Sequence, residues 1–350
     1  MTATSEAPPT ITPAHDLGAS APRVAVIGAG IAGLSAARAL VDGGVSVQVF
    51  DRGQRPGGRC STRRDGHHAF DHGAQYFTVR DARFAAALEP ACREGRVAAW
   101  HGTVVALARG RTQAIPATSR YVGVTGMGDL AERLAEGLPI VSQVTVAAAL
   151  PGPRDWQLVA TTGAELGRYN ALVLAMPPEQ ALRVVPRRGT LRQRLAGLAS
   201  APCWALLLGF EGRLPLPFDG AFVDDPAIGW MARDSAKPGR PAGERWVLHA
   251  TPAWSAARLH YTPERAAVEL LAAFWRATAL TPRAPRYRRA HRWALARPDA
   301  APPGELFDDR LAVAACGDWC RGGRVEGAWL SGEAVGTHLA ARLARTCAHR

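Results

Sequence analysis

The sequence predicts an α/β protein in which a Rossmann-type dinucleotide-binding domain is joined to a second, α+β domain built on an antiparallel sheet. A short β-branched run that ends in glycines, VAVIGAG, precedes a small-residue helix and a second strand, VSVQVFDR. That order is typical of a βαβ unit that opens a nucleotide-binding domain. Further along the chain, CWALLLGFE, AFVDD, GWMARD, ERWVLHAT and HRWALA form a series of short strand-like runs, which indicates the antiparallel sheet.

The remaining elements are expected in the following order. After a short helix around residues 84–94 come a strand at TVVALA, a glycine-led helix at GMGDLAERLAEG, and strands at VSQVTVAAAL, WQLVATT and YNALVLAMPP. A helix near residues 263–278 precedes a last parallel strand, LAVAACGD, and the closing helix VEGAWLSGEAVGTHLAARLAR. We therefore expect a disordered tail at 1–22, a discontinuous nucleotide domain at 23–75, 121–178 and 308–346, and a substrate domain at 76–120 and 179–307.

Composition narrows the class of protein. The chain has 350 residues, 47% of them hydrophobic and 21% charged, which is enough for a large buried core. Its formal charge of +12 comes with no interleaved basic and aromatic groove, so a nucleic-acid partner is not expected. Six scattered cysteines do not form a disulfide framework, and no apolar run approaches the length of a membrane span. A soluble, cytoplasmic monomer or homodimer is the expectation.

Three glycines carry the first functional motif. Gly28, Gly30 and Gly33 form G-x-G-x-x-G between the first strand and the helix. These glycines permit a tight turn, a close approach of backbone to a pyrophosphate, and packing of helix on strand. The helix N-terminus adds N–H donors for the phosphates. Asp51 stands at the end of the second strand, where an acid grips a ribose hydroxyl, so the motif predicts dinucleotide binding.

Two further segments distinguish FAD from NAD(P). Pro56-Gly57-Gly58-Arg59 resembles the GGR motif of the amine-oxidase-type flavoproteins, which helps to hold the FAD diphosphate. The segment from Cys316 to Gly332 resembles their second flavin segment, in which the acid, here Asp318, contacts ribityl hydroxyls and a helix N-terminus faces the flavin pyrimidine. The resemblance implies noncovalent FAD, and the expected cofactor-binding residues are Gly28, Gly30, Ile31, Ala32, Gly33, Asp51, Arg52, Gly58, Arg59, Gly73, Ala74, Gln75, Val144, Gly317, Asp318, Gly327, Ala328 and Ser331.

A narrower resemblance covers residues 23–345. FDHGAQYFTVRD, GWMARDSAKPGR, WVLHATPAWS and HRWALA are similar to segments of the bacterial renalase-like flavoproteins. That family implies a p-hydroxybenzoate-hydroxylase-like fold and the oxidation of isomeric dihydronicotinamide dinucleotides, 2- or 6-dihydroNAD(P), by hydride transfer to flavin N5. Dioxygen would then be reduced to hydrogen peroxide and NAD(P)+ released. Such a substrate becomes aromatic when it loses hydride, so a dedicated catalytic base is not required. The sequence accordingly offers no catalytic triad and no metal motif.

The candidates for the substrate pocket are drawn from the strands and loops of these segments. Tyr76, Trp230, Trp254 and Trp293 are aromatic walls or core residues, and His249 is a pocket donor or a structural histidine. Lys237 is the single lysine of the chain, and with Arg233 and Arg240 it either binds substrate phosphates at the pocket rim or forms a solvated basic turn. The expected pocket residues are Gln75, Tyr76, Trp230, Arg233, Lys237, His249, Trp254 and Trp293.

Two other functions stay open at this point. An amine oxidase or desaturase-like flavoenzyme would share the cofactor segments, although the branch usually has a lysine near flavin N5 on a substrate-domain strand, and Lys237 stands in a turn-like SAKPGR context. A noncatalytic flavin-binding sensor would share the fold as well, because a fold does not fix a function. Cys316 and Cys320 are interpreted as structural, with a redox pair as the alternative.

Overall fold

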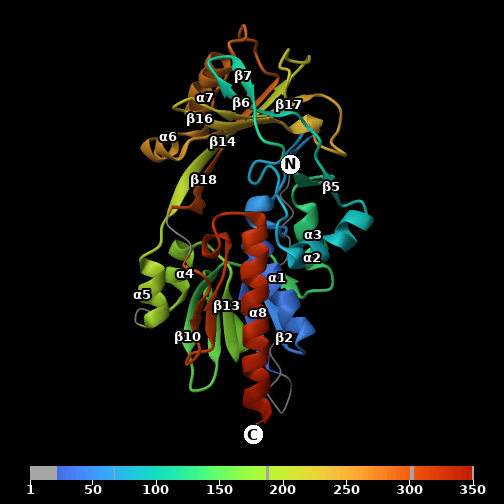
Figure 1. Ribbon diagram of the computed structural model, residues 1–350. Helices are drawn as coiled ribbons and strands as arrows, with labels where there is room; N and C mark the ends of the chain where they lie inside the picture. Colours follow the sequence, from blue (N-terminus) through green and yellow to red (C-terminus); the bar gives the residue numbers. More distant parts are fainter. Residues whose placement is uncertain (1–21, 67, 187–188, 300–302, 349–350) are drawn as a thin grey trace, which may run out of the picture.

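The computed structural model describes residues 22–66, 68–186, 189–299 and 303–348. Figure 1 shows two units stacked along the long axis of the molecule, each built around one large sheet. The tail expected at residues 1–22 lies outside the described residues except for Pro22. Within the described part of the chain, no helix is both long and apolar enough to span a bilayer.

The first unit is organised by a six-stranded sheet that follows the predicted Rossmann pattern. Its central strands pair in parallel, and β1 lies between β2 and β13. Only the edge strand β19 runs antiparallel, beside β20. The order across the sheet is β19 (Leu306–Asp308), β20 (Val313–Ala315), β13 (Ala171–Leu174), β1 (Arg23–Ile27), β2 (Ser46–Phe50) and β9 (Ile140–Val141).

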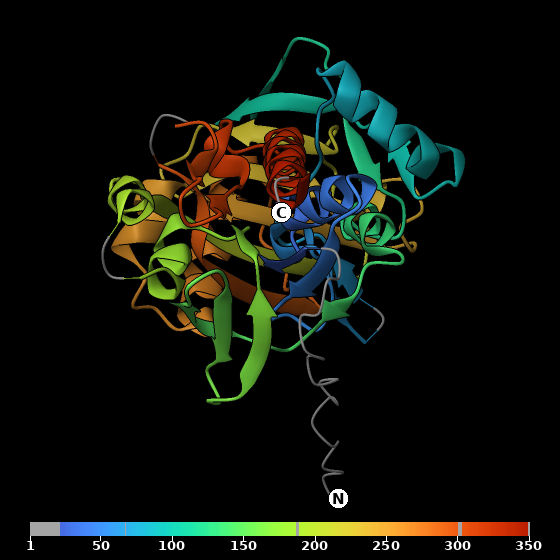
Figure 2. The ribbon, with the colours of Figure 1, turned by 90° about the horizontal axis from the view of Figure 1, so that it is seen from below.

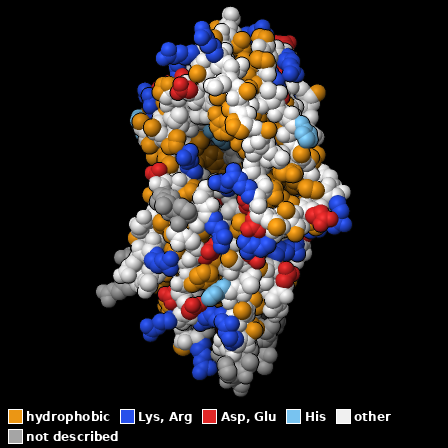
Figure 3. All heavy atoms as spheres, viewed as in Figure 1, with side chains coloured by type: hydrophobic (Ala, Val, Ile, Leu, Met, Phe, Trp, Pro, Cys, Tyr) orange, Lys and Arg blue, Asp and Glu red, His pale blue; other side chains and the backbone are white. Residues whose placement is uncertain are grey.

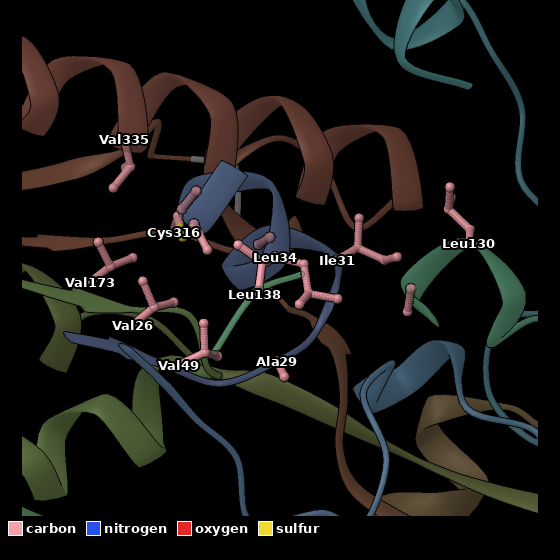
Figure 4. Packing of buried hydrophobic residues seen from close by; sticks show 14 of the residues in the cluster. Val26, Ala29, Ile31, Leu34, Val49, Leu130, Leu138, Val173, Cys316 and Val335 are labelled. Atoms are coloured by element: carbon pink, nitrogen blue, oxygen red, sulfur yellow. The ribbon is translucent and has the colours of Figure 1, made fainter. Parts of the chain in front are cut away.

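Two helices cover one face of this sheet. Helix α1 (Ile31–Asp42) and the long helix α8 (Val325–Ala348) lie side by side in Figure 2. They approach closely because Gly332 of α8 has no side chain: a Cβ there would lie 2.0 Å from the carbonyl oxygen of Ala32. Figure 4 shows Leu34 and Val335 from these helices above Val26 and Val173 of the sheet, in one buried cluster. The helix expected at residues 325–345 is thus confirmed.

The opposite face of the sheet packs on a second layer. Alternate strand residues, such as Ala25 and Leu172, belong to a cluster with the antiparallel strands β10 (Val146–Pro151), β11 (Trp156–Ala160) and β12 (Glu165–Tyr169). Helices α4 (Pro178–Val184) and α5 (Thr190–Ala196) bury Val184 and Leu195 in the same cluster. Helices α4 and α5 therefore pack with the nucleotide unit, whereas the expected partition assigns residues from 179 onward to the substrate domain.

The second unit is organised by a seven-stranded sheet. Its neighbours pair antiparallel, as predicted, except that β15 pairs in parallel with β6, which lies in the first part of the expected substrate domain, residues 76–120. One face is covered by α6 (Pro252–Ala257) and α7 (Pro263–Thr278), the latter at the predicted bounds. The strands follow the order β18 (Tyr287–Pro298), β14 (Ser200–Phe210), β17 (Glu244–Ala250), β16 (Ile228–Arg233), β15 (Gly220–Val223), β6 (Val104–Ala108) and β7 (Arg111–Ala114).

Short elements connect the two units. A hairpin of β3 (Arg63–Asp65) and β4 (His68–Phe70) leads into an extended loop at residues 71–76, which we name the central loop. It is followed by α2 (Ala82–Arg93) and by β5 (Val97–Ala99), which pairs with β8 (Tyr121–Gly123) before α3 (Asp129–Ala135). The predicted fold class, a Rossmann-type domain with an antiparallel second domain, is confirmed.

Candidate cofactor and substrate site

Each glycine of the first motif has a separate physical reason to lack a side chain. Gly28 has φ of +111°, and a Cβ there would lie 2.4 Å from the carbonyl oxygen of Ala175. At Gly33 a Cβ would lie 1.9 Å from the carbonyl oxygen of Gly28, so this glycine lets α1 approach β1. A Cβ on Gly30 would meet no protein atom within 4 Å. Gly28 and Gly33 therefore serve the fold, whereas Gly30, immediately before α1, leaves open space at the helix N-terminus.

Asp51 closes the other side of this turn. Its carboxylate accepts hydrogen bonds of 2.6 Å from the backbone N–H groups of both Ala29 and Gly53. The carboxylate thereby fixes the glycine loop against the end of β2. Val144 lies beside it, because its N–H donates to the carbonyl oxygen of Asp51 at 2.9 Å, and Arg52 is exposed. A carboxylate oxygen accepts more than one hydrogen bond, so Asp51 keeps the capacity to take a ribose hydroxyl.

Gly57 and Gly58 bring the second glycine motif against the first. The Gly57 N–H donates to the carbonyl oxygen of Ala29 at 2.8 Å, and both glycines have positive φ, +127° and +54°. A side chain at Gly73 would lie 1.9 Å from the carbonyl oxygen of Arg59, so the central loop rests directly on this motif. The second glycine motif thus contacts the first glycine motif on one side and the central loop on the other.

Arg59 links this motif to the C-terminal segment. Its guanidinium pairs with Asp318 at 2.7 Å and donates to the carbonyl oxygen of Ala296 at 3.1 Å. The two residues predicted to touch the diphosphate and the ribityl chain therefore lie together, paired with one another. Ser331 supports Asp318 from behind, because its hydroxyl accepts from the Gly317 N–H at 3.0 Å. Gly327 and Ala328 occupy the first turn of α8.

These contacts test whether a dinucleotide fits. The open space at Gly30 lies at the start of α1, whose first N–H groups are the donors that phosphates require. Asp51, at the end of the neighbouring strand, supplies a hydrogen-bond acceptor. Arg59 and Asp318, which pair with one another, supply a donor and a second acceptor. The residues present therefore fit a dinucleotide laid across the sheet edge. Their individual cofactor contacts stay predictions.

The second unit presents a row of rings toward the nucleotide unit. Trp230 on β16 pairs with His249 on β17, and Ala205 on β14 pairs with both His249 and His291 on β18. Side chains at paired positions share a face, so this row spans four strands. It lies on the face opposite the cluster of α6 and α7. Figure 3 shows a hollow between the two units, with hydrophobic atoms inside and basic side chains at its edge.

The central loop is held over this row. The carbonyl oxygen of His72 accepts from the indole N–H of Trp293 at 2.9 Å and lies 3.3 Å from Nε2 of His249. The His72 ring contacts those of His291 and Trp293, with centroids 4.7 and 4.9 Å away. Tyr76 contacts Trp230 at 5.4 Å. The central loop and the row together form a surface of flat rings.

The imidazoles in this surface are uncharged at neutral pH. Burial, and then the neighbouring His291, lower the pKa of His72 to about 3. Burial lowers the pKa of His249 and of His291 to about 4, with Arg63 adding to the effect at His291. Each ring is therefore a neutral hydrogen-bonding group. The Nδ1 atom of His72 is buried without a partner among the described residues.

Behind the central loop lies a cluster of buried charges. Lys237 Nζ contacts Asp71 at 2.8 Å and Asp234 at 2.7 Å, and Arg240 contacts Asp71 at 2.6 Å. All four side chains have 0% exposed surface. Burial raises the pKa of Asp71, but Lys237 and Arg240 outweigh it and hold that pKa below its ordinary value. Burial raises the pKa of Asp234. We name Asp71, Asp234, Lys237 and Arg240 the buried charge cluster.

The structure corrects two interpretations of the basic residues. Lys237 is neither on a pocket rim nor in a solvated turn, since two carboxylates hold it in the interior. Gln75 lies beside it, with its Oε1 3.5 Å from Nζ. Arg233 is 2% exposed and pairs with Asp219 at 2.9 Å and Glu244 at 3.3 Å. Its guanidinium also lies 4.9 Å from the centre of the Trp246 ring, on the face turned to α7.

Of the aromatic candidates, one is misplaced. Trp254 lies on α6 rather than on a strand, and it packs against Tyr261 and Arg258 in the cluster on the outer face of the sheet. It therefore cannot wall the hollow between the units. Tyr76, Trp230, His249 and Trp293 are brought together by the central loop and the sheet. Their contact with substrate remains a prediction.

Several site residues were missed by the sequence analysis. His291 stands within the predicted strand HRWALA, two positions before Trp293, and this spacing places both on one face. Trp100 and Arg120 join Tyr76 from the ends of β5 and β8. No local pattern distinguishes Arg120 among the many arginines of this chain. Burial of Cys316 and Cys320 raises the pKa of each thiol, in accord with the structural interpretation.

Comparison with known proteins agrees with the geometry of the first unit. Residues 26–88 match the family model of the NAD(P)-binding Rossmann-like domain. A protein of Mycobacterium tuberculosis described as a flavin-containing monoamine oxidase, AofH, is 38% identical over 130 residues, 34% of this chain and 28% of that protein. The neurosporene-forming phytoene desaturase of Rhodobacter capsulatus is 51% identical over 59 residues, 17% of this chain and 11% of that enzyme. This chain thus matches under a third of the length of these relatives.

Solved structures extend the likeness to both units. A crystal structure from Exiguobacterium sp. 255-15, described as a protoporphyrinogen oxidase, has a TM-score of 0.74 and 14% identity, and covers 92% of this chain and 99% of that one. Putrescine oxidase with bound putrescine has a TM-score of 0.66 and 13% identity, and covers 92% and 99%. At these identities the likeness concerns the fold. This chain therefore shares its α/β fold with these two oxidases, and the match to the Rossmann-like family model lies in its first unit.

Proposed function

We propose that this protein is a flavin-dependent oxidoreductase, an oxidase with noncovalent FAD that acts on isomeric dihydronicotinamide dinucleotides, 2- or 6-dihydroNAD(P). The observation that carries the proposal is the surface of uncharged rings between the two units. Trp230, His249 and His291 present flat, neutral faces there, and the central loop covers them. Such a surface suits a planar, uncharged ring that is to be held against another planar ring.

The cofactor proposal rests on the fitted dinucleotide site and on the relatives. The name of the M. tuberculosis relative points to oxidation with a flavin, and the description of the putrescine oxidase structure points to oxidation with a bound cofactor. Gly30, Asp51, Arg59 and Asp318 would hold FAD. FAD bound there would supply a two-electron acceptor that dioxygen reoxidises, so that substrate, O2 and one proton would give NAD(P)+ and H2O2.

The residues of this chain do the positioning. Trp293 and His249 fix the backbone of the central loop through the carbonyl oxygen of His72. The buried charge cluster fixes the same loop from behind. Because the substrate becomes aromatic on losing hydride, alignment and exclusion of water are the main requirements, and the neutral histidines remove no proton from carbon.

Oxidation of a small amine is the second candidate, since the matched relatives include amine oxidases. A protonated amine would need a carboxylate to receive it. Asp71 and Asp234 are already neutralised by Lys237 and Arg240, and burial keeps them out of the hollow. Because these two carboxylates are already paired, the uncharged dihydropyridine is favoured over the ammonium group.

The test is anaerobic mixing of the FAD-loaded protein with 2- and 6-dihydroNAD, with small amines such as putrescine in parallel. We expect rapid bleaching of the flavin absorbance by a dihydroNAD isomer, followed by recovery and peroxide formation when air is admitted. Bleaching by amines alone would replace the proposal with amine oxidation. If no donor bleached protein that demonstrably holds FAD, the noncatalytic sensor would be favoured.

A further inference from the structure

Arg120 is a buried cation without a countercharge. It is 8% exposed, and its Nη1 donates one hydrogen bond of 3.2 Å to the carbonyl oxygen of Thr118. Its Nε atom has no partner, and no carboxylate of the described residues forms an ion pair with it. Burying a charge is expensive unless the charge is paired. The guanidinium of Arg120 therefore has room for an acceptor that the described residues do not provide.

Other buried arginines of this chain have more acceptors, although the Nε atoms of Arg240 and Arg245 also lack a hydrogen-bond partner. Arg233 meets two carboxylates, and Arg240 meets Asp71 and the carbonyl oxygens of Gly123 and Val124. Arg245 donates to two carbonyl oxygens in the turn that precedes it. Arg120 donates one such hydrogen bond within the described residues, fewer than any of these three arginines.

The neighbours of Arg120 are also donors. Its guanidinium lies 5.2 Å from the centre of the Tyr76 ring, and Tyr76 in turn contacts Trp230 at 5.4 Å and Trp100 at 6.2 Å. The indole N–H groups of Trp100 and Trp230 are both buried without a partner. The far edges of the two indoles meet at Gly220, where a Cβ would lie within 3.2 Å of each. An indole N–H and a guanidinium only donate, so this group can satisfy an acceptor but not a donor.

We propose that Arg120, Tyr76, Trp100 and Trp230 form a subsite for an anionic group, a carboxylate or phosphate, carried by the substrate close to its planar ring. The proposal deepens the proposed function and rests on it for the planar ring at Trp230. In a dihydronicotinamide dinucleotide the anionic group is the phosphate joined to that ring through the ribose, because the carboxamide on the ring is uncharged. One aromatic ring, that of Tyr76, separates the guanidinium from Trp230. The subsite would thus select an anionic aromatic substrate and disfavour a cationic one.

The experiment measures binding rather than turnover. The FAD-loaded protein is titrated with benzoate, benzamide and benzylamine, which share one ring and carry charges of −1, 0 and +1, and the flavin absorbance reports occupancy. We expect the Kd of benzoate to be at least tenfold lower than that of benzamide, with benzylamine weakest. Arg120→Gln is expected to bring benzoate down to the affinity of benzamide, and Arg120→Lys to keep part of the preference.

Matched variants separate the subsite from net charge. Arg265→Gln removes a charge from the exposed surface of α7 and is expected to leave the three Kd values within twofold. Trp230→Phe keeps a ring and removes one N–H, so it should weaken benzoate more than benzamide. The proposal is overturned if benzoate fails to bind or binds no better than benzamide. It is also overturned if Arg120→Gln, with FAD and Tm retained, binds benzoate normally. Absent turnover of dihydroNAD would instead count against the proposed function, because these titrations need no reaction.

Discussion

The two units build their halves of the site from different parts of the chain. In the nucleotide unit the site is mainly backbone: Gly28, Gly30 and Gly57 shape a loop at the start of α1, and Asp51 fixes it. In the second unit the site is made of side chains, which come from three strands, β16, β17 and β18, and from the central loop. A backbone site requires the absence of side chains at a few neighbouring positions, whereas a side-chain site requires particular groups at distant positions.

The difference teaches where each half is vulnerable. A glycine loop fails locally, when a Cβ fills space that the ligand or the fold needs. A surface of side chains fails through its supports, because its rings are held by hydrogen bonds from other elements. The central loop belongs to both halves, since it rests on Arg59 and also carries His72 and Tyr76. Changes at the loop, at the glycines and at the rings should therefore have distinct consequences.

The largest effect is expected in the buried charge cluster behind the central loop. Lys237→Met leaves two buried carboxylates facing one arginine, so the free energy of unfolding should fall by about 3–5 kcal/mol in urea denaturation. The double variant Asp234→Asn with Lys237→Met removes one charge of each sign and should recover part of this loss. A change below about 1 kcal/mol for the single variant would show that the cluster does not hold the units together.

The glycines should divide the backbone half into two roles. Gly33→Ala places a Cβ against the Gly28 carbonyl and should destabilise the fold by about 1–3 kcal/mol. Gly30→Ala meets only open space, so thermal unfolding of the apoprotein should be unchanged while FAD affinity falls at least tenfold. Unaltered FAD affinity in Gly30→Ala would mean that the cofactor does not approach this turn.

The ring surface should make the protein sensitive to acid. The pKa values of His72, His249 and His291 are lowered by burial, so the unfolded chain binds more protons than the folded chain below about pH 6.5. Stability should fall as the pH decreases from about 6.5 toward 4. His249→Gln keeps a side-chain donor without a titrating ring, and it should flatten the curve of Tm against pH. An unchanged curve would exclude His249 as a source of the dependence.

The smallest effect is expected from a single supporting hydrogen bond. Trp293→Phe keeps a ring on β18 but removes the bond of 2.9 Å to the His72 carbonyl, at a loss of about 1 kcal/mol. His249 still approaches the same oxygen, which limits the damage. The measurement is Tm together with the rate of flavin reduction by dihydroNAD. If Trp293→Phe lowered Tm more than Gly33→Ala does, the ring surface would contribute more to stability than the glycine loop, contrary to this prediction.

Sequence by itself determined the backbone half of the site. The spacing of Gly28, Gly30 and Gly33 and the place of Asp51 after β2 follow from neighbours a few positions apart, and the structure has them as expected. Most strands of the second sheet were also predicted, because short apolar runs are a local signal, but β7 was not among them. Such features depend on short-range geometry, which a sequence pattern records directly.

Tertiary structure alone decided which side chains meet. The SAKPGR segment indicated either a phosphate-binding pocket rim or a solvated basic turn, yet Asp71, more than 160 positions away, pairs with Lys237 and makes burial tolerable. Trp254 fell on a helix at the outer face, and Arg120 gained its importance only from Tyr76 and from the lack of a carboxylate among the described residues. Whether a charge is paired or a ring is covered depends on strand order and register, and residues distant in sequence set these.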